Sequence, residues 1–430
     1  MAHYMPWYQS QPYSGYWGWH WTMNYFTPPG SIASHYHPLM GPYDSSDPHL
    51  LASQALQMKF AGMDGIIADW YGIEDFWDYA FIRDATDLFI DYIKMADLKY
   101  VMCYEDQTVK HMLNNGHFSN RTEAVAHGQT VMEWLGSNYF ADPSHLTIDN
   151  KPVLLCFGPQ FFTYNEWEQL FQNLNPQPLF FTLPYADAPK AGEFDWPDPD
   201  DGTSGVTASL DDFYNRADAN WQHYIGAAFP RFHDIYEEAG LGFSYGIIDD
   251  QNTATFTETL GRGILSNADI IQIVTWNDYG EGTIVEPTQE DNYTYLEIVQ
   301  QYRTSYIDPN FPYTASDLRL PTRLYTMRKT YQAIPAKMAQ LDSVETYLFA
   351  DQLARAEMLM NQVDCDTVIV GDFNGDCRVN LFDFERLSSS WLTSPPDSNW
   401  DPATDISDPQ DDTIDILDLQ KLAENWLNGI

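Results

Sequence analysis

Eight short apolar segments, separated by helical patterns, limit the folds open to this chain more than any other feature of its sequence. Each segment is too short for a core helix and is therefore predicted to form a buried strand. The strands are expected at residues 3–8, 65–70, 99–105, 152–157, 178–183, 192–196, 223–229 and 270–276. Helices are expected between several of them, at residues 47–61, 84–96, 121–140, 164–174, 211–219 and 253–266. This alternation predicts an α/β fold, the (β/α)8 TIM barrel.

The stretch that follows the last predicted strand is the strongest candidate for a catalytic site. It reads Trp-Asn-Asp-Tyr-Gly-Glu-Gly-Thr over residues 276–283. In a barrel of parallel strands, the loops at the carboxyl ends of the strands converge on one mouth. Asp278 and Glu281 can both point into that mouth and divide the acid and base work of a hydrolysis. The alternative is that Asp278 caps a turn and Glu281 is solvated, since Asp and Asn favour turns for local reasons.

Aromatic and polar residues gather at the other predicted strand ends and in the adjacent loops. Aromatic side chains present flat faces on which the apolar faces of sugar rings stack. We predict substrate contacts for Trp7, His20, Trp21, His37, Trp70, Tyr71, Glu105, Tyr185, Trp196, Arg231, Trp276 and Tyr279. Three structural alternatives stay open. The tryptophans Trp7, Trp70 and Trp276 could be core plugs at the barrel rim, Glu105 could pair with Arg231 as support, and His20 and His37 could be hydrogen-bonding surface groups.

The charge of the chain excludes two classes of partner. A formal net charge of −41 and a pI near 4.2 would repel nucleic acid and anionic membranes. The substrate is therefore expected to be neutral or cationic. The sequence contains no apolar run of the roughly 18 residues that a membrane-spanning helix needs. No signal peptide is visible, because a strand-like segment begins almost at the first residue.

Several separated motifs occur in the order found in one group of enzymes. They are Pro-Trp-Tyr at 6–8 with His-Trp at 20–21, His-Tyr-His-Pro-Leu-Met-Gly-Pro-Tyr-Asp-Ser at 35–45, Gln-Met at 57–58 and Ala-Gly-Met-Asp-Gly at 61–65. Together they resemble glycoside hydrolase family 99, the endo-α-mannosidases and bacterial endo-α-mannanases. The loop at 276–281 is more similar to family 71, the α-1,3-glucanases, whereas Gly282-Thr283 and Glu286-Pro287 return to the family 99 pattern. The resemblance covers roughly residues 3–290.

The resemblance implies roles for individual residues. Glu281 matches the catalytic acid/base of both families, and Asp278 matches the second carboxylate, which is Asp in family 71 and Glu in family 99. Glu105 matches an acidic residue that contacts sugar near the cleavage point, and Glu286 is expected to bind substrate. In family 99 the Glu is thought to deprotonate the sugar 2-OH with net retention, whereas family 71 is described as inverting. A side chain one methylene shorter moves the carboxylate by about 1.5 Å, so both outcomes stay open.

The same acid and base roles follow from chemistry. The acid must hold its proton near neutral pH, so an apolar wall or a nearby like charge must raise its pKa. Trp276 and Tyr279 adjoin Glu281 and can supply such a wall. No metal is needed for this step, and no His/Cys/Asp spacing of the zinc type appears in the sequence. We therefore expect no cofactor for catalysis.

The C-terminal region contains a duplicated loop and helix. Residues 379–392 match residues 414–427, which is a strong repeat signal. In the first copy Asp372, Asn374, Asp376, Arg378, Asn380 and Asp383 occupy positions 1, 3, 5, 7, 9 and 12 of a calcium loop, with a backbone carbonyl at position 7. In the second copy Asp405, Asp411, Asp415 and Asp418 offer oxygens at irregular spacing. The alternative for each loop is an acidic surface turn without metal.

This repeat resembles a type I dockerin, a calcium-dependent module that docks extracellular enzymes onto cohesin-bearing partners. The resemblance implies structural Ca2+ and a cohesin-like protein or cell-surface scaffold as partner. Cys103 and Cys156 are expected to be buried and inert, whereas Cys365 and Cys377 could form a disulfide in an oxidising compartment. An extracellular or periplasmic location is expected. The domains are predicted as a barrel at 1–335, a helical linker at 336–363 and the dockerin-like module at 364–430.

The sequence thus predicts an endo-acting glycoside hydrolase that cleaves α-glycosidic bonds in a polysaccharide or oligosaccharide. The wide aromatic rim favours an open cleft, with α-mannan as the first substrate and α-1,3-glucan as the second. The alternative is a non-catalytic carbohydrate-binding barrel that the calcium-dependent module localises. In a third hypothesis the C-terminal repeat is the main functional element and the barrel is its cargo.

Overall fold

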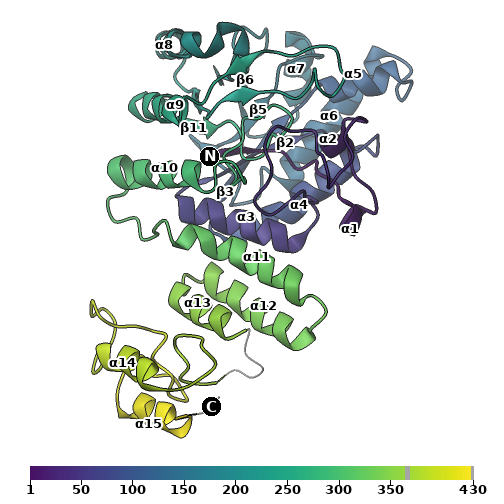
Figure 1. Cartoon of the computed structure of the whole chain (residues 1–430). Helices are drawn as coiled ribbons and strands as arrows, with labels where there is room; N and C mark the ends of the chain where they lie inside the picture. The colour runs from purple at the N-terminus through teal and green to yellow at the C-terminus, as the bar shows by residue number, and fades with distance from the viewer. Residues whose placement is uncertain (364–368, 428–430) are drawn as a thin grey trace. The chain divides into compact units, whose positions relative to one another are not determined.

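The computed structural model of the chain describes residues 1–363 and 369–427. It divides into two compact units, Met1–Leu318 and Arg319–Ile430. The first unit is built on one parallel sheet with the strand order β7-β6-β5-β3-β2-β1-β11-β8 (Figure 1). A bridge between Phe194, just after β7, and Ile225 on β8 joins the two ends of this sheet. The first unit is therefore a parallel eight-stranded near-barrel with surrounding helices, consistent with the predicted (β/α)8 fold.

Each predicted strand segment contributes one strand to this sheet. The strands are β1 Ala2–Tyr4, β2 Gly65–Trp70, β3 Lys99–Tyr104, β5 Lys151–Cys156, β6 Leu179–Thr182, β7 Gly192–Glu193, β8 Ile225–Ala228 and β11 Ile270–Ile273. Several end earlier than predicted, because the residues after them leave the ladder and turn into the mouth of the barrel. The sequence did not predict β4 Thr147–Ile148, which pairs antiparallel with β5, or the hairpin of β9 Phe232–His233 and β10 Ile247–Ile248.

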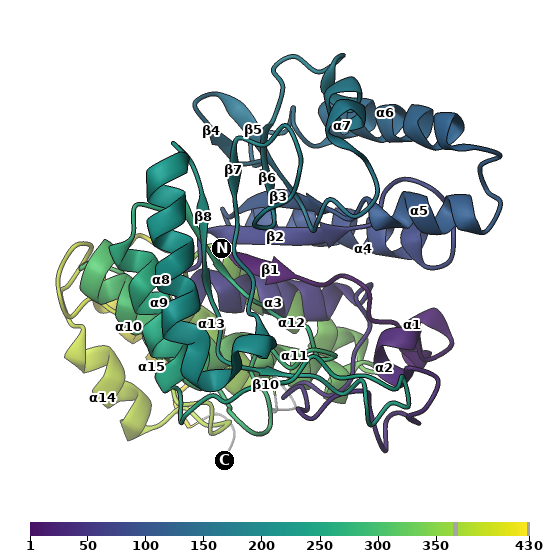
Figure 2. The same cartoon turned by 90° about the horizontal axis from the view of Figure 1, so that it is seen from above.

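Helices surround the strands of the first unit. They are α1 Gln11–Ser14, α2 Trp19–Thr22, α3 Pro48–Ala61, α4 Tyr79–Met95, α5 Gln107–Asn114, α6 Arg121–Asn138, α7 Tyr164–Phe171, α8 Gly202–Asn220, α9 Ala254–Leu265 and α10 Thr294–Tyr302. In Figure 2, α6 and α7 lie on one side of the strands, and α8 and α9 lie on another. Local signals set the helix ends. For example, the Asp47 side chain accepts from the His49 N–H at the start of α3, and Gly62 ends this helix at a φ of 83°.

The interior of the barrel is filled by apolar side chains. Ile67 on β2, Val101 on β3, Val153 on β5 and Phe181 on β6 belong to one fully buried cluster. Because side chains alternate along a strand, Asp69 shares the interior side of β2 with Ile67. The neighbouring Trp70 instead packs between the sheet and α6, where its ring lies 5.7 Å from that of Trp134. The apolar layer therefore forms a floor below the polar side chains at the carboxyl ends of the strands.

The second unit consists of helices joined by loops. They are α11 Leu320–Tyr331, α12 Pro335–Phe349, α13 Leu353–Gln362, α14 Leu381–Ser389 and α15 Ile416–Glu424. The region predicted as one helical linker contains two helices, because Asp351 has a φ of 60° and reverses the chain between them. Cys377 is disulfide-bonded, whereas its predicted partner Cys365 lies outside the described residues. Within residues 1–363 and 369–427, no helix has the length and apolar character needed to cross a membrane.

Candidate active site

A cavity of about 360 Å³ opens at the carboxyl ends of the barrel strands, and both predicted catalytic carboxylates line it. The structure brings seven of the predicted residues together around this cavity: Trp7, His20, Tyr71, Glu105, Trp196, Asp278 and Glu281. They come from segments spread over most of the first unit. This convergence is what parallel strands produce when their carboxyl ends share one mouth.

The loop that carries the two carboxylates is fastened to the first strand segment. The Asn277 side chain accepts from the Met5 N–H at 2.8 Å and donates to the Met5 carbonyl at 3.0 Å. The Tyr8 hydroxyl donates to the Asn277 carbonyl and accepts from the Tyr279 N–H. These bonds hold the peptide groups on both sides of Asp278, so the backbone of this residue has little freedom.

Asp278 and Glu281 are close neighbours through the backbone of the loop. The Glu281 N–H donates to Asp278 Oδ1 at 2.9 Å, and the Asp278 N–H donates to Thr275 Oγ1 at 2.7 Å. The Glu281 Oε2 atom is buried without a hydrogen-bond partner among the described residues. One carboxylate is thus stabilised by a backbone donor, and the other retains an unsatisfied oxygen.

The surroundings separate the proton affinities of these two groups. Burial raises the pKa of Asp278 to about 6, although the Glu281 N–H and the charge of His20 oppose the rise. Burial and then the nearby charge of Asp278 raise the pKa of Glu281 well above its usual range. Near neutral pH, Asp278 is therefore the ionised member of the pair and Glu281 the protonated one, which is the division that acid and base catalysis needs.

Two further acidic side chains line the same cavity. Burial raises the pKa of Glu105 to about 7, while a hydrogen bond from Gln107 opposes this rise. Asp69, which lies at a predicted strand end but was given no role from the sequence, is at the end of β2 with its Oδ2 atom buried and without a partner among the described residues. Side chains two positions apart on a strand share a face, so the prediction that Tyr71 faces the cavity could also have identified Asp69.

Aromatic side chains form the walls of the cavity. The ring of Trp7 stacks on that of His20 at 4.3 Å and an interplanar angle of 9°. Sequence reasoning missed Tyr236, Phe243 and Tyr245, which lie in the segment between β9 and β10 and line the cavity as well. Other lining residues that were not predicted are His3, Met5, Tyr8, Trp19, Met23, Gln107, Phe157, Gln160, Leu241 and Gly280.

The segment between β9 and β10 is shaped by one carboxylate. Asp234 Oδ2 accepts from the Tyr245 N–H at 2.8 Å and from the Ser244 hydroxyl at 2.9 Å, while its Oδ1 accepts from the Tyr236 N–H. The rings of Tyr236, Phe243 and Tyr245 contact one another. A single side chain therefore holds this aromatic wall in place.

Four predicted substrate-binding residues lie behind the catalytic loop and do not line the cavity. Glu286 accepts from the hydroxyls of Tyr279 and Tyr43, each at 2.8 Å, and burial raises the pKa of Glu286 to about 7. Trp21 packs on Tyr8 with ring centroids 4.2 Å apart. Trp276, at the start of the loop, is fully buried. Because these four side chains are buried, we interpret them as structural supports of the loop at 276–283.

Three other predicted residues lie elsewhere on the first unit. Trp70 faces away from the barrel interior, as described above. Tyr185 is 76% exposed and lies beside the Arg216 guanidinium. His37 forms an exposed ion pair with Glu290 at 2.8 Å.

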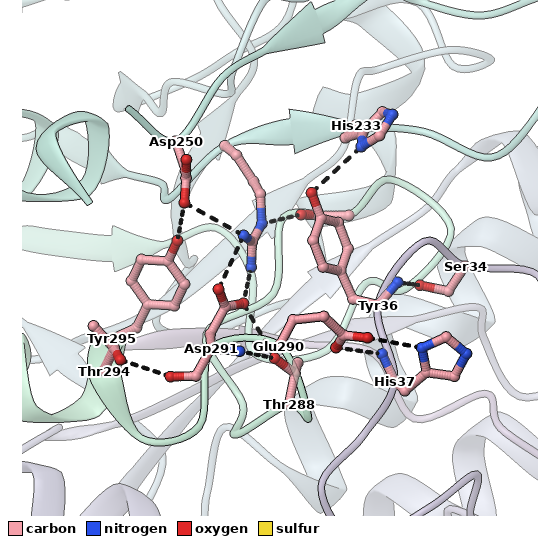
Figure 3. A network of polar contacts seen from close by, with 12 residues as sticks. Ser34, Tyr36, His37, His233, Asp250, Thr288, Glu290, Asp291, Thr294 and Tyr295 are labelled. Carbon is pink, nitrogen blue, oxygen red and sulfur yellow. Dashed lines mark hydrogen bonds and ion pairs between the residues drawn. The ribbon is translucent and has the colours of Figure 1, made fainter. Parts of the chain in front are cut away.

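Arg231 is the centre of a buried polar network beneath the catalytic loop. Its guanidinium pairs with Asp291 and lies 3.9 Å from the ring centroid of Tyr36. Its Nε donates to the carbonyl of Gly282, next to Glu281, at 3.3 Å. Figure 3 shows the surrounding network, in which Asp250 and Asp291 face the same centre. Arg231 thus supports the loop through Asp291 and Gly282, and the pairing with Glu105 that the sequence left open does not form.

Comparison with known proteins gives a likeness in fold. No protein-family model matches the sequence, and a search of curated proteins returned no match. Two solved structures of GH99 endo-α-mannosidase from Bacteroides thetaiotaomicron, one in complex with bis-tris propane, are similar to it with TM-scores of 0.56 and 0.55. Each is 18% identical to this chain, covers 71% of it and is itself covered to 96%. A GH113 β-1,4-mannanase is less similar, with a TM-score of 0.41 and 10% identity over 60% of this chain and 94% of its own. The first unit thus has the (β/α)8 fold of the GH99 structures.

The first acidic loop of the second unit is held by hydrogen bonds among its own residues. Asn374 Nδ2 lies 3.2 Å from Asp376 Oδ2, and Asn380 Nδ2 lies 3.5 Å from the same oxygen. Gly375 has a φ of 73°, which permits the sharp turn between them. Asp372 and Asp383 are buried at the two ends of the loop. The donor types fit Ca2+, which prefers carboxylate and carbonyl oxygens.

The second acidic loop has the same frame with two additional residues. Asp418 Oδ1 accepts from the N–H groups of Ile406 and Ser407, as Asp383 Oδ1 does from those of Phe373 and Asn374. Asp383 lies 11 positions after Asp372, whereas Asp418 lies 13 positions after Asp405. The irregular spacing in the second loop therefore reflects two additional residues between its ends. The ends of the two loops form the same hydrogen bonds.

Replacing Arg231 by Met should destabilise the first unit by about 3–5 kcal/mol, because it leaves the charge of Asp291 unpaired in a mostly buried place. The double variant Arg231→Met with Asp291→Asn should recover part of this loss. The exposed ion pairs of Arg262 provide the control, and Arg262→Met should cost less than about 1 kcal/mol. Urea unfolding followed by tryptophan fluorescence measures all three. Equal losses for Arg231→Met and Arg262→Met would contradict the assignment.

Proposed function

We propose that this chain is an endo-acting glycoside hydrolase that cleaves α-glycosidic bonds in a polysaccharide. The observation that carries the proposal is that Asp278 and Glu281 line one cavity and that their surroundings favour the ionised form of one and the protonated form of the other. Cleaving a glycosidic bond requires such a pair, one group to protonate the leaving oxygen and one to act as base. The fold likeness to GH99 endo-α-mannosidase supports the same conclusion.

In the proposed mechanism Glu281 donates its proton to the glycosidic oxygen as the bond to the anomeric carbon breaks. Asp278 accepts a proton either from the sugar 2-OH, which then attacks the anomeric carbon, or from a water that attacks directly. In the first route the attack closes a 1,2-anhydro sugar; Glu281 then takes a proton from the water that opens this ring, and Asp278 returns its proton to the 2-oxygen. In the second route the proton that Asp278 takes from the water passes through solvent to Glu281, which restores both groups. The Asn277 and Tyr8 bonds hold Asp278 in place, so little reorganisation is needed during the reaction.

The walls of the cavity suit a neutral sugar polymer. Trp7, Trp196 and Tyr236 offer flat apolar faces to the cavity. The GH99 neighbours are endo-α-mannosidases, and this supports α-mannan as the first substrate. We keep α-1,3-glucan as the second, because the loop sequence around Asp278 resembles family 71.

Glu281→Gln should lower kcat/KM on the cognate polymer by at least about 10²-fold, because the amide cannot donate the proton that the leaving oxygen needs. Release of new reducing ends from yeast α-mannan and from α-1,3-glucan measures this. Glu168→Gln is the matched control, since Glu168 is exposed on α7 away from the cavity. Full activity of Glu281→Gln would contradict the mechanism. Binding without cleavage of either polymer by the unaltered chain would favour a non-catalytic carbohydrate-binding barrel instead.

The pH profile of kcat/KM should be bell-shaped. Activity should rise as the pH increases through about 6, where Asp278 loses its proton, and fall again at the raised pKa of Glu281. A glycosyl fluoride needs no proton on its leaving group, so with this substrate Glu281→Gln should retain the acidic limb and lose the alkaline one. An alkaline limb that persists in Glu281→Gln would show that this limb reports another group, such as Glu105 or Asp69, and not Glu281.

We also propose that the second unit binds structural Ca2+ in its two acidic loops and serves as a docking module. Exposed apolar side chains occupy the same first positions of both repeated helices, Leu381 and Phe382 on α14, and Ile416 and Leu417 on α15. Paired exposed apolar residues of this kind suit a protein partner, and a cohesin-like protein or cell-surface scaffold is the proposed one. Binding of a purified cohesin module with and without a chelator tests this role.

An extracellular or periplasmic location is part of the same proposal. Cys377 is disulfide-bonded, and disulfides persist mainly in oxidising compartments. Fractionation of the source cells, with detection of the full chain in the medium or periplasm, tests the location. A chain found only in the cytosol with reduced cysteines would contradict it.

Saturating Ca2+ should stabilise the second unit, by about 2.7 kcal/mol when the free ion is 100 times its dissociation constant. Asp376→Asn removes a charge from position 5 without disturbing a buried group and should weaken binding at least tenfold, which removes about 1.4 kcal/mol of that gain. Calorimetric titration of the chelator-treated full chain measures the affinity for Ca2+, and unfolding with and without Ca2+ measures the stabilisation. Glu385→Gln removes an exposed charge from α14 and should leave binding unchanged. Equal affinities for all three chains would contradict a calcium loop at 372–383.

A further inference from the structure

We propose that His3, Asp69 and Cys103 form a binding site for a zinc-type divalent ion at the floor of the cavity. One ligand atom from each of these residues lies within 4.8 Å of the other two, and all three side chains are buried. They come from the adjacent strands β1, β2 and β3: Asp69 is paired with Cys103, and His3 is paired with Ile67, which precedes Asp69 by two residues on the same face of β2. This site goes beyond the proposed hydrolysis, and it stands whether or not the chain cleaves a glycan.

The donor set is the one that zinc prefers. An imidazole, a carboxylate and a thiolate bind Zn2+ at about 2.0–2.3 Å, and tetrahedral ligand atoms then lie roughly 3.5 Å apart. The ligand atoms lie no more than 4.8 Å apart, so a small rotation of the side chains brings them to this spacing. Ca2+ and Mg2+ are disfavoured because they take oxygen ligands. A thiolate with an imidazole instead favours zinc and its borderline relatives.

The ring of His3 is held in the orientation that a metal ligand needs. Gln272 Nε2 donates to the Asp195 carbonyl at 2.6 Å, so the oxygen of the Gln272 amide is the atom that faces His3. His3 Nδ1 lies 3.3 Å from this oxygen and therefore carries the proton in the hydrogen-bond network. The other ring nitrogen of His3 retains its lone pair. A ring N–H held by a neighbouring acceptor is the usual support of a metal-bound histidine.

The electrostatics of the cavity favour a cation at this place. Asp69, Glu105, Asp278 and Glu281 line the cavity, and its lining within the described residues contains no Lys or Arg. Asp69 Oδ2 is buried and lacks a hydrogen-bond partner among the described residues. Leaving a buried acceptor unpaired costs about 1–3 kcal/mol. A divalent ion would satisfy that oxygen and balance the clustered charge.

The place of the site gives it an entry path and an open position. His3 and Asp69 line the cavity, whereas Cys103 lies among the apolar residues of the barrel interior. The ion would therefore sit between the apolar floor and the mouth, with three protein ligands and one position that faces the cavity. A water or a sugar hydroxyl suits that fourth position. The site would thus help to bind the substrate from below the two catalytic carboxylates.

Cobalt(II) tests the site with a signal that does not depend on activity. A thiolate bound to Co2+ gives a strong near-ultraviolet charge-transfer band, and tetrahedral Co2+ gives visible bands. Titration of the chelator-treated, reduced full chain with Co2+ should show both, with saturation at one ion per chain. Zinc should then displace the cobalt and remove the colour. No charge-transfer band in the unaltered chain would overturn the proposal.

Two cysteine variants provide a matched comparison. Cys103→Ser should remove the charge-transfer band, whereas Cys156→Ser should keep it, since Cys156 is also buried and free but is outside the cluster. Gln272→Ala should weaken cobalt affinity by about 10–100-fold through loss of its hold on His3. Circular dichroism shows which variants fold. A band that survives in folded Cys103→Ser, or an affinity unchanged in Gln272→Ala, would overturn the assignment.

Discussion

The side-chain amide of Asn277 joins the segments that follow the first and the last strands of the barrel, and the geometry of the cavity depends on it. It exchanges two hydrogen bonds with the backbone of Met5, a residue 272 positions earlier in the chain. Both groups are buried, so each bond left unmade would cost the desolvation of a donor or an acceptor. Because Asp278 follows Asn277 directly, the hydrogen bonds that join the β1 and β11 segments also position Asp278, the proposed base.

A second layer of polar contacts holds the loop from the side that faces away from the cavity. Glu286 collects hydroxyl donors from Tyr43 and Tyr279 on one side, and Arg231 reaches the carbonyl of Gly282 on the other. Each of these charges is buried and has partners, which is the condition under which a buried charge is tolerated. The rigidity of the loop that carries Asp278 and Glu281 therefore depends on residues that do not line the cavity. Substitutions there should disturb the site without touching the substrate.

The sequence predicts the architecture well, because strand and helix patterns are local. It predicts Asp278 and Glu281 for the same reason, since one short loop carries both. Prediction from the sequence fails where the role of a residue depends on the direction of its side chain or on a partner that is distant in the chain. The sequence favoured Trp70 as a sugar-binding residue and gave no role to Asp69. Side chains alternate between the two faces of β2, however, so Asp69 points inward and Trp70 outward. Arg231 pairs with Asp291, a choice among many acidic residues that no local pattern can make.

The same limit explains why spacing rules could not have suggested the metal site that we propose in the barrel. Such rules recognise ligands that one loop or one helix turn brings together. His3, Asp69 and Cys103 are separated by 66 and 34 positions in the chain, and only the parallel pairing of three strands brings them together. The acidic loops of the second unit are the opposite case, because the residues proposed to bind calcium follow one another within one short segment, as at 372–383. A site whose ligands come from different strands can be recognised only when the pairing register of the sheet is known.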